Sequence, residues 1–185
     1  MGAQMSLPAS VQALWEELQA VREQILKEAE GLSQAQADWR QSERDWSVGE
    51  ILHHLTLAEI NTGKLTTKLT REAAQAEKLA PFPPDLKAFE PLPASPPGPA
   101  DAPPVVRPEK GHPIAELLAD IKATRERTRQ SIEKLGSWDP RPLTWTHFRL
   151  GDLNLAQWWM LQAHHDRDHL HQLRAVRAAP GFPKA

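Results

Sequence analysis

The chain has 185 residues and a formal net charge of −2 at pH 7. This length predicts a single domain over residues 1–185, and the lack of a basic bias gives no electrostatic support for nucleic-acid binding. Because the chain has no cysteine, disulfides, thiolate metal ligands and a cysteine nucleophile are all excluded.

The first half of the chain predicts two long helices from apolar residues at three- and four-residue spacing. The first covers about residues 10–32. The second begins after Ser47 and continues to about Gln75, because Ser47 and Glu50 have the spacing of a capping box. Both helices present one apolar face, which is typical of helices that pack against one another.

A proline-rich segment follows at residues 81–113, which contain 12 of the 17 prolines. Proline interrupts both helices and central strands, so neither is expected there. We interpret the segment as a long crossover between helices, with a lid or a partner-binding segment as the alternative. A loop of this length is uncommon in a compact domain, so some ordering against the surface is expected.

Two more helices are predicted after the prolines. The third covers about residues 114–135 and stops at Gly136, and the fourth begins at Asp152 or Asn154 and continues to about Ala178. The connector between them shows no convincing strand pattern. The sequence therefore predicts an all-α fold, a four-helix bundle with the proline-rich crossover between its second and third helices.

The fourth helix carries two histidines at a spacing that suits one metal ion. His165 and His169 are four residues apart, so their imidazoles lie on the same face of a helix. With 100° per residue and Leu155 as the centre of the apolar face, His169 lies about 40° and His165 about 80° from it. His164 and His171 lie about 160–180° away and are expected to face solvent.

The second helix carries a candidate third ligand. His54 lies about 60° from Ile51 at the centre of that helix's apolar face, whereas His53 lies about 160° away. His54, His165 and His169 are therefore the candidate metal ligands. Two alternatives remain from the residues alone: polar histidines satisfied within the core, or an exposed histidine tract with incidental metal affinity.

Two further residues are candidates near this site. Asp166 lies about 20° from the core centre, where a carboxylate is costly unless it is paired or hydrogen-bonded. It could orient a ligand imidazole, or it could form a buried ion pair with an arginine. His147 precedes the fourth helix and could lie at the mouth of the site, with ordinary solvent exposure as the alternative.

The same segments resemble a known family. Residues 46–55 resemble the Trp-Ser-x-x-Glu-x-x-x-His-Leu opening of the second helix in the DinB-like superfamily, and residues 151–159 with His165, His169 and Gln172 resemble its last helix. The nearest resemblance is to the YfiT-like branch, described as metal-dependent hydrolases and bacillithiol-dependent transferases. The proline-rich segment departs from the shorter crossover usual in the family.

The resemblance implies an up-down-down-up four-helix bundle, often a homodimer, in which His54, His165 and His169 bind zinc or, alternatively, nickel. It implies an enzyme that acts on a small electrophilic substrate, either by hydrolysis or by transfer to a low-molecular-weight thiol. Any such thiol must come from a co-substrate, since the chain has no cysteine. The alternative is a non-catalytic, metal-stabilised dimer that binds a partner.

The expected partners and location follow from the remaining composition. No apolar run approaches the roughly 20 residues that span a bilayer, so no membrane partner is expected. The N-terminus lacks the charged and apolar regions of a secretory signal, so a cytoplasmic protein is expected. A small-molecule substrate and a second copy of the chain are the expected partners, with no nucleic acid.

Overall fold

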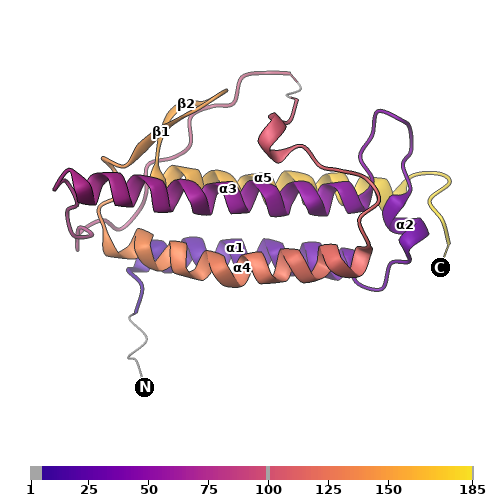
Figure 1. Ribbon diagram of the computed structural model, residues 1–185, viewed down its shortest axis with the longest axis horizontal. Coiled ribbons are helices and arrows are strands. Elements are labelled where there is room, and N and C mark those ends of the chain that lie inside the picture. The colour runs from indigo at the N-terminus through magenta and orange to yellow at the C-terminus, as the bar shows by residue number, and fades with distance from the viewer. Residues whose placement is uncertain (1–5, 99–100, 185) are drawn as a thin grey trace.

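The computed structural model describes residues 6–98 and 101–184. Four long helices lie side by side (Figure 1): α1 (Ala9–Ala29), α3 (Val48–Gln75), α4 (Ile114–Ser137) and α5 (Leu155–Ala178). Four short elements connect them: α2 (Gln34–Asp38), the 3₁₀ helix η1 (Pro104–Val106), and the antiparallel strands β1 (Thr144–His147) and β2 (Gly151–Asn154). The mostly helical fold predicted from the sequence is confirmed. None of the described helices is both long enough and apolar enough to cross a bilayer.

Side-chain caps fix where the two histidine-bearing helices begin. Ser47 and Glu50 form the predicted capping box at the start of α3, each bonding the other's backbone N–H. Asn154 and Gln157 form the equivalent pair at the start of α5. These caps accept hydrogen bonds from backbone N–H groups that have no partner within the helix. Because the first residue of each helix is fixed in this way, the helix face on which each later residue lies is fixed too.

The expectation that the connector before α5 has no strands is wrong. Thr144 pairs with Asn154 and His147 with Gly151 in a short antiparallel hairpin. The chain reverses over residues 148–150, and Gly151 directly after this turn has a φ of +73°, a conformation that glycine adopts readily. The strands are only four residues long and mostly exposed, so they lack the apolar alternation that indicates a strand.

Helix boundaries differ slightly from prediction at three points. The first helix begins at Ala9, directly after Pro8, rather than near residue 10, and it ends at Ala29 rather than near residue 32. The helix predicted to stop at Gly136 continues to Ser137. A Cβ at position 136 would lie 3.0 Å from Pro8 Cδ, so the glycine allows the start of α1 to approach α4 closely.

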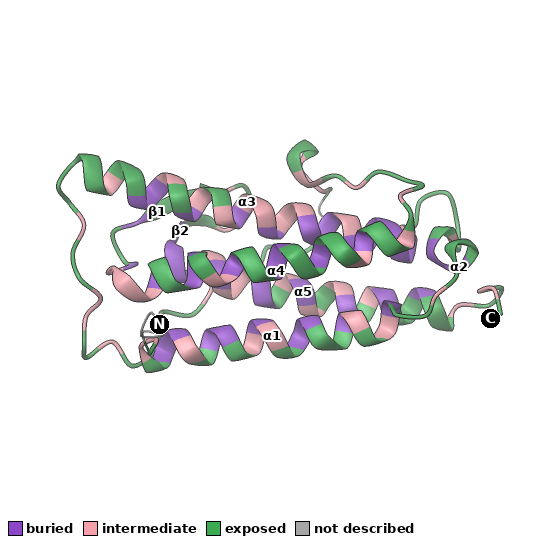
Figure 2. Cartoon of the chain, turned by 60° about the horizontal axis from the view of Figure 1, so that its bottom comes forward, coloured by how far each residue is buried: buried purple, intermediate pink, exposed green. Residues whose placement is uncertain are grey.

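Helices α1 and α5 run in one direction, and α3 and α4 run in the other (Figure 1). Helix α3 contacts both α4 and α5, and α1 contacts both α5 and α4. Figure 2 shows buried positions along the helix faces that turn toward one another. Leu18, Ile51, Ile132 and Leu173 are examples of fully buried apolar residues, one from each long helix.

Residues 76–98 and 101–113 lie along the outside of the helices, and hydrogen bonds hold the first of these stretches there. Ser10 Oγ donates to the carbonyl of Leu86 at 3.0 Å, and Gln157 Nε2 donates to the carbonyl of Pro91 at 2.9 Å. The proline-rich segment is therefore ordered against the surface where it is described.

A network of four buried charges lies within the helices, one from each long helix. Arg22 of α1 bonds Glu59 of α3 at 2.7 Å and Asp166 of α5 at 2.8 Å. Arg125 of α4 bonds the same two carboxylates at 2.7 and 3.1 Å. The side chains are at most 5% exposed, and Gln162 donates a further hydrogen bond to Asp166 at 2.8 Å.

This network predicts a large difference between two substitutions on α4. Arg125→Met would leave two buried carboxylates facing one guanidinium, and we expect it to lower the free energy of unfolding by about 3–5 kcal/mol. Lys122→Met on the same helix removes an exposed pair with Glu30 and should cost about 0–1 kcal/mol. Denaturant titrations of both variants would measure this, and equal losses would contradict the role assigned to the network.

Candidate metal centre

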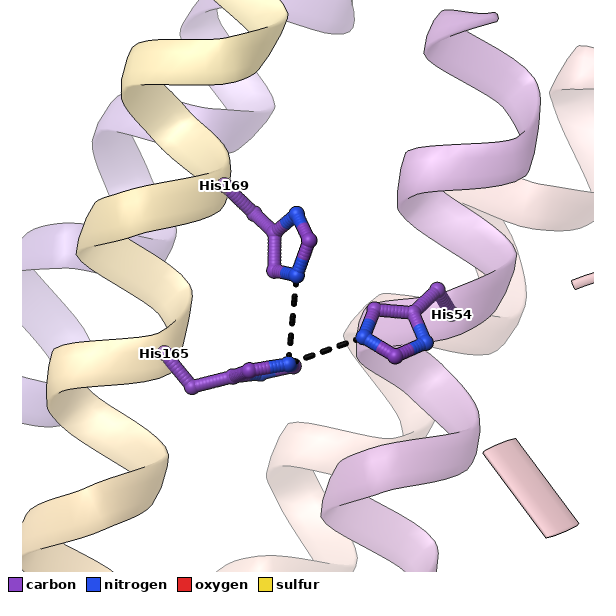
Figure 3. A group of neighbouring side chains, drawn as sticks. All are labelled: His54, His165 and His169. Atoms are coloured by element: carbon purple, nitrogen blue, oxygen red, sulfur yellow. Dashed lines mark hydrogen bonds between the residues drawn. The ribbon is translucent and has the colours of Figure 1, made fainter. Parts of the chain in front are cut away.

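Three histidine side chains from two helices converge on one point (Figure 3). His54 Nε2 of α3 lies 2.8 Å from His165 Nε2 of α5, and His169 Nε2 lies 3.2 Å from the same atom. One nitrogen from each residue lies within 4.8 Å of the others. The structure thus brings together the three histidines selected by helical periodicity, while His164 and His171 are exposed.

Hydrogen bonds fix the tautomers of two of these rings. His54 Nδ1 lies 2.6 Å from the carbonyl oxygen of Val106, and His169 Nδ1 lies 2.7 Å from Gln172 Oε1. Because both oxygens can only accept, each Nδ1 carries the proton and each Nε2 presents a lone pair. Both lone pairs point toward His165, so the centre of the cluster is rich in acceptors.

A divalent cation would satisfy the nitrogens of the three imidazoles better than hydrogen bonds among the rings do. His165 Nε2 can donate its proton to only one of its two neighbours, and its Nδ1 has no hydrogen-bond partner among residues 6–98 and 101–184. A cation would satisfy all three lone pairs at once. Tetrahedral zinc bonds of ~2.0–2.1 Å separate ligand nitrogens by roughly 3.3 Å, which is near the observed spacing. The three imidazoles could therefore hold a divalent metal.

Burial keeps these imidazoles in their metal-binding form. It lowers the pKa of His54 to about 4, and it lowers the pKa of His165 well below its usual value. The pKa of His169 is also lowered by burial. All three rings are neutral at pH 7, so a metal ion would not have to displace a proton from them.

Asp166 does not orient a ligand imidazole by hydrogen bonding, which corrects one of the two expectations for it. In the described chain its carboxylate bonds Arg22, Arg125 and Gln162 and none of the three histidines. The other expectation, a buried ion pair with an arginine, is what the structure shows. The two arginines reach Asp166 from α1 and α4, so its oxygens are already engaged.

Val106 and Trp46 complete the surroundings of the histidines. Sequence reasoning missed Val106, and it noted Trp46 only as the first residue of the motif that contains His54. Val106 acts through its backbone carbonyl, which every residue has, so no side-chain signal could have identified it. The Trp46 ring stacks on His169 at an interplanar angle of 16° and packs beside His54. Gln172 is the one orienting group that had a sequence signal, its place in the motif around His169.

The histidines lie in the wall of a cavity of about 790 Å³. His147 on β1 is half-buried and lines the same cavity. Its Nδ1 accepts hydrogen bonds from the backbone N–H groups of Arg149 at 3.2 Å and Leu150 at 3.3 Å. Burial, with a smaller contribution from Arg149, lowers the pKa of His147. A neutral ring with Nδ1 occupied in this way carries its proton on Nε2 and can act as a hydrogen-bond donor.

Comparison with known proteins identifies a family. The sequence model of the DinB superfamily matches residues 17–173, which include all three histidines. No curated protein and no solved structure matches the chain. The match extends from α1 to α5 and includes the proline-rich segment.

Protonation of His54 should destabilise the metal-free protein in mild acid. Its pKa is about 4 in the folded chain and about 6.5 when unfolded, so the unfolded state binds more protons between these values. The free energy of unfolding should therefore fall as the pH is lowered from about 6.5 to about 4. Urea titrations across this range would measure the slope, and a His54→Gln variant should show a shallower one. An unchanged slope in the variant would contradict this assignment.

A metal ion on His54 should also tighten the segment that contains Val106. A metal ion on Nε2 of His54 makes the Nδ1 proton a stronger donor to the Val106 carbonyl. The neighbouring His53 holds the same segment, because its Nδ1 accepts a hydrogen bond from the backbone N–H of Glu109 at 3.0 Å. Zinc should therefore slow trypsin cleavage after Lys110. Cleavage after Lys87, in the same proline-rich segment but far from η1 in sequence, serves as the internal control and should not change.

Mass spectrometry of the timed digests would give both cleavage rates. In a His169→Ala variant, zinc should have much less effect on cleavage after Lys110. Equal protection at both lysines, or none at either, would show that the segment does not respond to the histidine cluster.

Proposed function

The chain belongs to the DinB superfamily, and on that premise we propose that His54, His165 and His169 bind a divalent metal ion at the centre of an enzyme active site. The observation that carries this proposal is the convergence of three neutral imidazoles, two with fixed Nδ1 protons, in the wall of a cavity. Zinc is the first choice and nickel the alternative, since imidazole suits both.

The proposed reaction is attack on a small electrophilic substrate, by water in a hydrolase or by a low-molecular-weight thiol in a transferase. A bound divalent ion would act as a Lewis acid and lower the pKa of water or of a thiol. The chain contributes no thiol of its own, because it has no cysteine. A transferase would therefore need a thiol co-substrate, as in the YfiT-like branch that the sequence resembles.

The chain's own residues would bind the substrate and shape its surroundings. The carbonyl of Val106 and the Gln172 side chain hold two ligand rings in the required tautomer. Trp46 covers the His169 ring and limits access of bulk water from that side. His147 can donate its Nε2–H to a substrate oxygen in the cavity. This hydrogen bond would stabilise the negative charge that develops on that oxygen during acyl or thiol transfer.

We also propose the finer architecture that the family implies. The opposed directions of the helix pairs support an up-down-down-up four-helix bundle in which residues 76–113 are the crossover. A homodimer remains a proposal from the family resemblance. Size-exclusion chromatography with light scattering, with and without zinc, would measure the mass of the particle.

Metal content is the direct test of the site. Tag-free wild-type protein should contain near-stoichiometric zinc or nickel by mass spectrometry, and His54→Ala and His169→Ala variants should lose it. His171→Ala removes an exposed histidine two residues from His169 and should retain the metal. Wild-type protein that stays metal-free after incubation with both ions would overturn the proposal.

Catalysis is tested by separating the role of the metal in the fold from its role in the reaction. An enzyme should keep its helical circular dichroism when a chelator removes the metal, and should lose turnover of electrophilic substrates. Turnover that requires an added small thiol would identify a transferase, and thiol-independent turnover a hydrolase. Loss of the fold together with the metal would instead favour a metal-stabilised binding protein.

A further inference from the structure

The cavity beside the three histidines is much larger than a small electrophile needs. Its volume of about 790 Å³ falls within the roughly 300–1,000 Å³ of sites that enclose drug-sized ligands. Its walls come from α3, α5, the β1–β2 hairpin and the segment around η1. The size and the walls of the cavity therefore indicate what the rest of the ligand is like, in addition to its reacting group.

The large apolar side chains that are exposed in the described structure lie at the rim of this cavity. Three large apolar residues are strongly exposed there: Val105 at 62%, Trp145 at 45% and Phe148 at 62%. All three line the cavity, although Val105 comes from η1 and the other two come from the hairpin region. Exposed apolar side chains that gather at one cavity indicate an apolar ligand surface.

Cationic side chains line the same cavity along α3. Lys64, Lys68 and Arg71 follow one another at four- and three-residue spacing, so they lie on one face of the helix. Lys68 Nζ lies 4.0 Å from the centre of the Trp145 ring and 3.0 Å from Glu72 Oε2. Lys64 is exposed, with no ion-pair partner in the described chain, so its ammonium is available to a ligand.

Other charges in the wall do not cancel this cationic end. Arg149 adds a fourth cation, which donates to the carbonyls of Pro96 and Gly98. The carboxylates that line the cavity are Asp101 and Asp168, and Asp168 is adjacent in sequence to His169 at the histidine end. The wall therefore carries four cations against two carboxylates, with three of the cations on one helix face.

The two ends of the cavity are well separated. His54 and Lys64 are ten residues apart on one helix, which corresponds to about 15 Å along its axis, and Lys68 lies about 6 Å farther. Between them most of the cavity surface is apolar and includes Leu65, Leu161 and Trp158, with the polar residues Asn61, Thr62 and Gln162 beside them. A ligand that reaches from the histidines to the lysines must have an extended apolar body.

We propose that the cavity binds an elongated organic anion, an acid group joined to a long alkyl or arylalkyl body. The acid group lies at Lys64 and Lys68, and the body lies between the hairpin and η1. The opposite end reaches the three histidines. A reaction at this end of the ligand rests on the proposed function. Binding of the anion does not depend on it.

Binding to metal-free protein tests the proposal independently of catalysis. Isothermal titration calorimetry would compare dodecanoate, dodecanol and dodecyltrimethylammonium, each below the concentration at which it self-associates. Dodecanoate should bind tightest, and butyrate, which has the same acid group without the long body, should bind much more weakly. Equal binding of the alcohol or the ammonium compound would overturn the anionic assignment, and equal binding of butyrate would overturn the elongated one.

Charge-reversal variants locate the acid group. Lys64→Glu should weaken dodecanoate binding on the order of tenfold, because it replaces an attraction with a repulsion at a partly exposed site. Lys27→Glu makes the same change on an exposed position of α1 outside the cavity and should leave the affinity unchanged. Both positions are exposed, so both variants should fold. An unchanged affinity in Lys64→Glu, or equal weakening in both variants, would overturn the proposed position of the acid group.

Discussion

Four buried charged side chains, one from each long helix, form the interaction on which the rest of the structure depends. Each arginine bonds both carboxylates, so no two helices can slide past each other without breaking charge-assisted hydrogen bonds in the core. Asp166 follows His165 directly, and Glu59 lies five residues after His54 on α3. The same bonds that align the helices therefore set the spacing of the histidines across them.

Helical periodicity alone could select the three histidines, because burial of an apolar face fixes the rotation of a helix and therefore the direction of every side chain on it. The same reasoning placed Asp166 in the core. It could not identify the partners of Asp166, because Arg22 is 144 residues away and Arg125 is 41 residues away. The Val106 carbonyl and the exposed β1–β2 hairpin could not be predicted from the sequence either, since neither has a distinctive apolar pattern.

The two segments with the weakest sequence signals form much of the cavity wall. The hairpin is shaped by His147, whose ring accepts two backbone N–H groups of the turn, and the η1 segment is tied to His54 through Val106. Both segments are thus held by histidines on the cavity side. Loops carried on a rigid helical scaffold can change in length and composition without disturbing the core, so substrate preference can vary while the three histidines stay in place.

The buried network also determines how strongly a metal at the histidines would polarise a ligand. Two arginines and two carboxylates sum to zero charge, so Asp166 does not place an uncompensated negative charge beneath the site. Neutral imidazoles likewise add no negative charge, unlike a carboxylate ligand. Because His54 is only 4% exposed and charge interactions are stronger away from bulk water than in it, a divalent ion at this position would retain much of its effect on a bound ligand. A core that cancels its own charge is therefore part of what would make the three histidines a reactive centre.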